Sequence, residues 1–201
     1  TDITTATVWD QAYRELRPGG SLTWQDEEIG SYFTNNRGHH RVVAVDGAGA
    51  PFYAWQGEAR ADPAQQGGFL ASVAPVVSIA RALEAQRGSV APSVPPTDPT
   101  LAETAAGLIQ FEGEIYLVAA STVTPEKAET VRRPGPGALV VSAQNLDRAF
   151  LGEVRNLGAT GARTGTGPAP GATAVPLHDT RGRLLGHVAW APKQPGGRAA
   201  R

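Results

Sequence analysis

The chain has 201 residues, of which 41% are hydrophobic and 18% charged, so it carries enough apolar side chain for one packed domain. Its formal net charge of −1 provides no basic field for phosphates, which argues against a DNA- or RNA-binding protein. The absence of cysteine excludes disulfides, thiol nucleophiles and cysteine-ligated zinc. Methionine is also absent, so we interpret the sequence as a processed chain or an excised fragment.

The sequence predicts no membrane span, because no uninterrupted run of 18 apolar residues occurs and no signal peptide is visible at the N-terminus. The longest apolar segment, Phe69 to Leu83, is interrupted by Ser72, Pro75, Ser78 and Arg81. We expect a single domain over residues 1–201. It would comprise N-terminal helices (1–36), a mixed body (37–191) and a short tail (192–201).

The N-terminal part of the sequence shows the periodicity of helices. Apolar residues at four-residue spacing predict a long helix from Thr1 to Arg17, which Pro18-Gly19-Gly20 ends. A second helix is expected to begin near Thr23, whose hydroxyl would cap it, and to end before Gly38.

The periodicity then becomes alternating, which predicts strands. His39 to Val45 and Phe52 to Gln56 form a hairpin pattern with a glycine-rich loop between them. Asp62-Pro63 opens a third helix, expected from Phe69 to Gln86, which Pro75 starts or kinks. Residues 88–100 are rich in proline and serine and predict a surface loop.

A second hairpin pattern follows, from Gly107 to Glu112 and from Glu114 to Thr122. Residues 124–137 are polar and proline-containing, and Ala138 to Gln144 predicts another strand. Asn145 is then expected to cap a helix that Gly158 ends.

The remaining sequence predicts a mobile segment and a last hairpin. Residues 159–172 are rich in glycine, threonine and proline and are expected to be mobile. Ala174 to Leu177 and Leu184 to Trp190 form the hairpin, and residues from Pro192 onward are expected to lack structure. Strand pairs joined by tight turns favour an α+β fold with a central antiparallel sheet and helices mainly on one face, and argue against a parallel nucleotide-binding fold.

The familiar catalytic and metal-binding patterns are missing. His39 and His40 are adjacent on a strand and would point to opposite faces, and no HExxH or facial-triad spacing occurs, so we predict no metal and no cofactor. The glycines of Thr160 to Gly167 lack the phosphate-loop pattern, and no serine lies in GxSxG. We therefore predict no catalytic residue, although a triad assembled only in three dimensions remains open.

Aromatic residues suggest a ligand site instead. The candidate ligand-binding residues are Tyr32, Arg41, Tyr53, Trp55 and Tyr116. Aromatic walls with a few polar groups are typical of small-molecule sites, and an arginine can hold a ligand carboxylate with two hydrogen bonds. The alternative is that these rings fill the core between helices and sheet and that Arg41 is an exposed strand residue.

The order of several segments resembles a known family. These segments are WDQAY (Trp9 to Tyr13), IGSYFTNNRGHHRVVAVDGAGAPFYAWQG (Ile29 to Gly57), FLASVAPVVSIAR, IYLVAASTVTPE (Ile115 to Glu126), ALVVSAQNLDRAFL and VPLHDTRGRLLGHVAWAPKQPG (Val175 to Gly196). Together they resemble the CHASE sensory domains of the fourth type, the cyclase/histidine-kinase-associated sensory extracellular domains, over almost the whole chain.

The resemblance implies a periplasmic input domain held between two transmembrane helices of a bacterial protein. The usual cytoplasmic partners are GGDEF and EAL modules of cyclic di-GMP signalling, or histidine kinases. It also implies a fold like that of the PAS-like Cache sensors, with a long N-terminal helix and a central antiparallel sheet. It supplies no catalytic residues and no ligand. The family's common aspartate is replaced by His40 in GHHR, which implies a different ligand, or none, if that position recognises one.

We therefore expect an extracytoplasmic domain that senses an unidentified small molecule, is anchored in the membrane on both sides, and dimerises through its first helix. The alternatives are a periplasmic hydrolase whose site is assembled only in three dimensions and a dimerisation module that binds no ligand.

Overall fold

A computed structural model of the protein describes residues 2–87, 102–126, 133, 135–156, 161–167 and 171–191. Its centre is a six-stranded sheet with the strand order β3-β2-β1-β6-β5-β4. The strands are β1 (Arg41–Val45), β2 (Pro51–Gln56), β3 (Ala59–Arg60), β4 (Thr104–Phe111), β5 (Glu114–Thr122) and β6 (Leu139–Asn145). Every pairing in this sheet is antiparallel, so the predicted α+β fold with a central antiparallel sheet is confirmed. The likeness to PAS-like Cache sensors stays a prediction.

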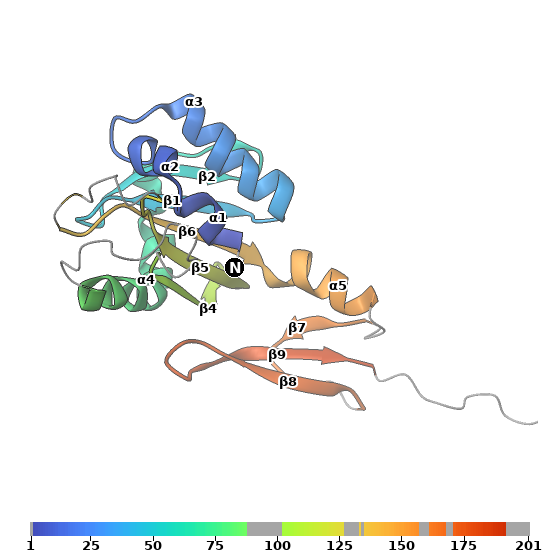
Figure 1. The fold of residues 1–201 in the computed structure, drawn as a ribbon. Coiled ribbons are helices and arrows are strands. Elements are labelled where there is room, and N and C mark those ends of the chain that lie inside the picture. The colour runs from blue at the N-terminus through green and yellow to red at the C-terminus, as the bar shows by residue number, and fades with distance from the viewer. Residues whose placement is uncertain are drawn as a thin grey trace, which may run out of the picture.

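Helices cover both faces of the sheet, and not mainly one face as the sequence predicted (Figure 1). The reason lies in β1, where Val43 and Val45 face one side while Val42 and Ala44 face the other, and all four are buried. A strand with buried residues at successive positions has to be covered on both sides.

The helix α4 (Gly67–Arg87) follows a short turn, η2 (Pro63–Gln66), and covers the first face. Its inward residues repeat at helical spacing and are fully buried against the sheet: Phe69, Val73, Val76 and Ala80. The predicted helix is confirmed, and it begins well before Pro75, which therefore lies inside it and does not start it.

The segment Pro63–Gln86 is also long and apolar enough to cross a membrane by length and composition alone, although it contains no uninterrupted run of 18 apolar residues. Packing of one face on the sheet accounts for part of this composition. Ile79 and Leu83 lie on the outer side and are exposed.

The second face is covered by the N-terminal helices, and here the sequence prediction was wrong. The expected continuous helix over residues 1–17 is two short helices, α1 (Asp2–Thr7) and α2 (Asp10–Glu15). Between them the backbone pairs with the chain just after β5. The Trp9 N–H donates to the Thr124 carbonyl (3.1 Å), and the Thr124 N–H donates to the Thr7 carbonyl (2.9 Å). These bonds hold Trp9 in an extended conformation, which interrupts the helix.

The next helix confirms the prediction, with a different cap. It begins as α3 (Leu22–Gln25) and continues as η1 (Asp26–Asn36), which has the wider winding of a π-helix. The cap is Ser21 and not Thr23, because the Ser21 hydroxyl accepts the Trp24 N–H. Ile29 and Phe33 are fully buried on the sheet.

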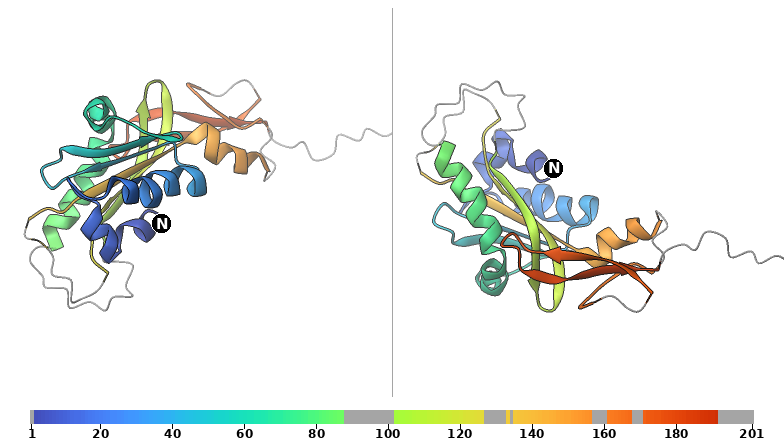
Figure 2. Two further views of the ribbon diagram at one scale, coloured as in Figure 1. Left: turned by 90° about the horizontal axis from the view of Figure 1, so that it is seen from above. Right: turned by 90° about the horizontal axis from the view of Figure 1, so that it is seen from below.

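The C-terminal part forms a sheet of its own (Figure 2). After β6, the Asn145 side chain caps η4 (Leu146–Phe150), which leads into α5 (Leu151–Asn156), as predicted. A short strand, β7 (Arg163–Gly165), falls where a mobile segment was expected, because its backbone pairs with β9. The final hairpin of β8 (Thr173–His178) and β9 (Leu184–Trp190) is confirmed.

This second sheet lies against β4 and β5 rather than extending the central one. The Thr180 methyl group occupies the place where a Cβ at Gly107 would lie, only 2.4 Å from it, so the hairpin turn approaches β4 closely because that residue is glycine. The predicted loop 88–100, the end of the helix at Gly158 and the tail 192–201 lie outside the described residues.

Candidate functional site

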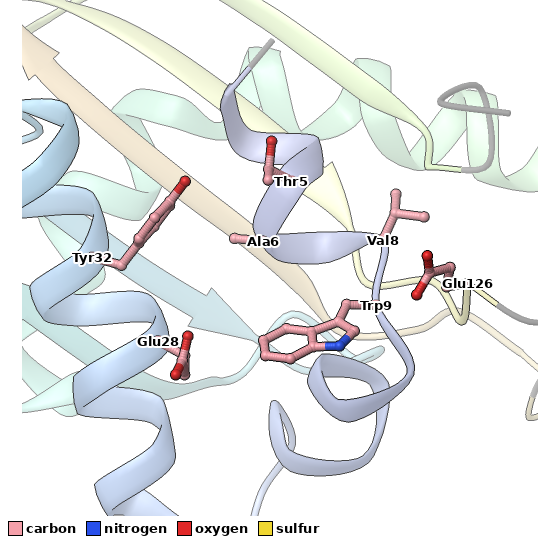
Figure 3. A pocket seen from close by; sticks show the side chains of 7 residues that line it. All are labelled: Thr5, Ala6, Val8, Trp9, Glu28, Tyr32 and Glu126. Atoms are coloured by element: carbon pink, nitrogen blue, oxygen red, sulfur yellow. The ribbon is translucent and has the colours of Figure 1, made fainter. Parts of the chain in front are cut away.

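A cleft of about 510 Å³ opens between the N-terminal segment and η1 (Figure 3). It is lined by Thr5, Ala6, Val8, Trp9, Glu28, Tyr32 and Glu126. Its volume falls within the range of ~300–1,000 Å³ that is typical of small-molecule sites. Three segments that are distant in the sequence build it, and they are held together by the packing of the second sheet face.

The break between α1 and α2 presents Trp9 to the cleft. Because Trp9 is extended and not helical, its side chain leaves the line of the helix, and its indole lies 5.7 Å from that of Trp24, centroid to centroid. Trp24 is almost fully buried, so it is a fixed support for the Trp9 ring. The buried Trp24 indole N–H finds no acceptor in the described part of the chain.

Glu28 and Tyr32 lie four residues apart on η1, so both side chains project from one side of this helix toward the N-terminal segment (Figure 3). The Tyr32 hydroxyl accepts two hydrogen bonds from the Arg37 guanidinium, at 2.8 and 3.1 Å. These bonds fix the orientation of the Tyr32 ring.

Glu126 reaches the cleft from the chain after β5. Its backbone N–H donates to the Asp10 carboxylate (3.1 Å), and the Thr7 hydroxyl bonds the Ser121 hydroxyl (2.8 Å). Both contacts connect the N-terminal helices to the end of β5, so they hold this side of the cleft against the central sheet.

The lining has a net negative character. Among the described residues that line the cleft, none is basic, and two are carboxylates. Neither Glu28 nor Glu126 forms a salt bridge within the described ranges. With its aromatic walls, a threonine hydroxyl and two carboxylates, the cleft combines the kinds of groups that are typical of small-molecule sites.

The structure does not bring the five predicted site residues together. Tyr32 alone lines the cleft. Tyr53 and Trp55 lie on the same sheet face but belong to the packing under η1. The Tyr53 hydroxyl donates to Asp26 (3.2 Å), and burial followed by the Asp26 charge raises the pKa of Tyr53 far above its usual value. The Trp55 indole N–H donates to the Gly57 carbonyl (2.9 Å).

Arg41 and Tyr116 lie on the opposite sheet face, under α4. The Arg41 guanidinium stacks between the rings of Phe69 and Phe111, at 5.0 and 5.1 Å from their centroids, and donates to Gln66 (3.2 Å). Arg41 is therefore neither placed at the cleft nor an exposed strand residue. The Tyr116 hydroxyl donates to Glu114 (2.8 Å), and burial, then this bond, raises the pKa of Tyr116.

His40, the second histidine of GHHR, has a structural partner. Its Nδ1 accepts the Asn145 backbone N–H (3.0 Å). Burial lowers the pKa of His40, the Arg148 charge lowers it further, and Glu114 acts in the opposite direction. In the described parts of the chain, no three histidine, aspartate or glutamate side chains gather in a way that would hold a metal.

A second hollow, of about 320 Å³, lies between α4, β4 and the β8–β9 turn. Its charged residues include Asp179, Arg181 and Arg183. The Asp179 carboxylate is used by the turn itself, because it accepts the backbone N–H groups of Arg181 and Arg183 at 2.9 Å each. Those bonds, the one from Arg183 first, lower the pKa of Asp179.

Sequence reasoning missed Trp9, Glu28 and Glu126 as site residues. Trp9 falls inside the helix expected from Thr1 to Arg17, and Glu28 inside the helix expected to begin near Thr23. A signal was nonetheless present: Trp9, Tyr32 and Glu126 belong to three of the segments that carry the family resemblance, and these segments converge at the cleft.

Residues 1–163 match the model of the CHASE4 domain family. No curated protein matches the chain. The matched range contains every residue that lines the cleft and ends before the turn that lines the second hollow.

Proposed function

Because the chain belongs to the CHASE4 family, whose members are extracellular sensory domains and not catalytic ones, we propose that it senses a small molecule for a bacterial transmembrane signalling protein. The observation that carries this proposal is the open cleft with aromatic walls inside the family-matched range. A ligand there would touch α1, the Val8–Trp9 junction and η1 at once.

Ligand binding in the cleft would produce a signal by changing how the N-terminal segment is placed. A ligand that contacts both Trp9 and η1 favours the arrangement in which the N-terminal segment is docked on the end of β5. The size of the response is set by the difference in ligand affinity between the docked and undocked arrangements. We propose that this change of population is what the rest of the protein detects.

The proposal extends to the parent protein, its location and its partner. The family resemblance supports a periplasmic location, membrane anchors on both sides, and a cytoplasmic partner that is a GGDEF/EAL module or a histidine kinase. A homodimer through the N-terminal helices belongs to the same proposal. Cyclic di-GMP or phosphoryl output of the intact protein, measured with and without a ligand of this domain, tests the partner.

A thermal-shift screen of the 201-residue chain with amino acids, carboxylates, amines and nucleobases tests ligand sensing. At about 100 times its Kd, a ligand is expected to raise the melting temperature by roughly 5–10 °C. Trp9→Ala should abolish the shift, because it removes one cleft wall. Trp190→Ala, on β9 and away from the cleft, is the matched control and should retain it.

Two outcomes contradict the proposal. A screen in which no compound stabilises the chain favours a dimerisation module without a ligand. Turnover of a substrate by the isolated chain favours the periplasmic hydrolase.

A further inference from the structure

We propose that the ligand of the cleft is an organic cation, whose positive charge is attracted by Glu28 and Glu126 and covered by the Trp9 ring. This inference rests on the proposed function, since it takes the cleft to be the sensing site. It adds the chemical class of the ligand, which the family does not supply.

The first argument for a cationic ligand is the negative charge of the residues that line the cleft. Figure 3 shows the carboxylates of Glu28 and Glu126 on opposite sides of the Trp9 indole. They come from different elements, η1 and the chain after β5, so only the folded protein brings them to one cleft. Within the described ranges neither is neutralised by an arginine or lysine. Two carboxylates without a basic partner among the described residues attract a cation and repel an anion.

The second argument is the Trp9 ring, which forms an aromatic wall of the cleft. A cation is attracted to the face of an aromatic ring, and tryptophan provides the strongest such attraction. The Tyr32 ring already has a cationic neighbour, because the Arg37 guanidinium carbon lies 5.4 Å from its centroid. No arginine or lysine of the described residues lies over the Trp9 ring, and Trp24 supports this ring. The ligand cation is therefore expected to contact the face of the Trp9 ring.

The same arrangement explains why a carboxylate ligand is disfavoured here. The arginine expected to hold a carboxylate, Arg41, lies on the opposite sheet face and is stacked between two phenylalanine rings. Arg37 is engaged by the Tyr32 hydroxyl. An anion in the cleft would face the like charges of Glu28 and Glu126 without a basic residue in the described lining.

Calorimetric titration of the 201-residue chain with four probes tests the inference. Choline and putrescine carry ammonium groups, 3,3-dimethylbutan-1-ol has the shape of choline without its charge, and glutarate is a dianion. We expect choline or putrescine to bind at least tenfold more tightly than the neutral isostere, with no detectable binding of glutarate. Raising the salt concentration should weaken the binding, because partly exposed charges are screened.

Charge-neutral variants connect the binding to the cleft. Glu28→Gln should weaken the binding of the ammonium probe by roughly five- to tenfold, as expected for one partly solvated charge contact. Glu126→Gln, at an exposed position, should weaken it by about threefold, because water screens its charge more strongly. Trp9→Leu should weaken it by about fivefold or more, through loss of the ring face. Glu27→Gln makes the same charge change on the exposed neighbouring position of η1, outside the lining, and should leave the affinity within about twofold.

Each possible result decides between the two proposals. If neither ammonium probe binds at 20 mM while another compound in the wider screen binds in a manner lost with Trp9→Ala, the cation inference is wrong and the sensing function stands. Equal binding of choline and its neutral isostere, or full affinity in both glutamine variants, also overturns the cation inference. If no compound binds in the wider screen, the sensing function itself fails.

Discussion

His40 makes a hydrogen bond that only its uncharged form can make. Its Nδ1 accepts the backbone N–H of Asn145, the residue whose side chain caps the next helix. Protonation of Nδ1 turns this acceptor into a donor that faces another donor. Burial and the nearby Arg148 charge lower the pKa of His40 for the same reason, since both disfavour the imidazolium form.

The stability of the protein should therefore fall in mild acid. Because the pKa of His40 is lower in the folded than in the unfolded chain, the unfolded chain takes up the proton first as the pH falls below about 6.5. The contribution of His40 to the free energy of unfolding is complete above that pH and is lost as the pH falls to the folded pKa. Chemical denaturation at pH 7.5 and 5.5 should show a smaller loss for His40→Asn, which keeps an acceptor, than for the natural chain.

His178→Asn, at an exposed position of β8, is the control and should lose as much stability as the natural chain. An equal loss in the His40→Asn variant would show that this histidine does not bind fewer protons when folded.

The helix η1 approaches β2 closely because position 30 is glycine. A Cβ built at Gly30 would lie 2.3 Å from the Tyr53 hydroxyl oxygen and 2.4 Å from the Trp55 ring. Both rings are held by hydrogen bonds, to Asp26 and to Gly57, so they cannot move away easily.

Gly30→Ala tests this contact. Helix propensity alone would stabilise the chain by about 1 kcal/mol, because alanine suits a helix better than glycine. Overpacking against fixed rings costs about 1–3 kcal/mol and should outweigh it, so the free energy of unfolding should fall. Gly67→Ala is the matched control, since position 67 is helical with nothing within 4 Å, and it should be neutral or slightly stabilising. A gain of stability in both variants would mean that η1 does not pack this tightly.

The elements that the sequence could predict are those fixed by local patterns. The hairpins of β1 and β2, β4 and β5, and β8 and β9 follow from alternating residues around glycine turns, and α4 from its apolar repeat. The break at Trp9 could not be predicted in this way, because it depends on pairing with Thr124, far along the chain.

At the scale of the whole molecule, the two faces of the sheet have different roles. The α4 face is a closed apolar core, with Arg41 stacked at its margin. The other face carries the N-terminal helices and η1 (Figure 1), and the cleft opens between them (Figure 3). The candidate residues divided between these faces because β1 and β2 pair with Arg41 opposite Gln56, which puts the Arg41 side chain on the face opposite to those of Tyr53 and Trp55. The hairpin pattern in the sequence did not fix this register.

Hydrogen exchange of the 201-residue chain, with and without saturating choline, tests most directly that this cleft is the sensing site. We predict slower exchange of the backbone amides at Val8 and Trp9 and over the part of η1 that carries Glu28 and Tyr32, with no change in the β8–β9 hairpin. Protection confined to the β8–β9 turn and α4, around the second hollow, would place the ligand elsewhere and contradict the account.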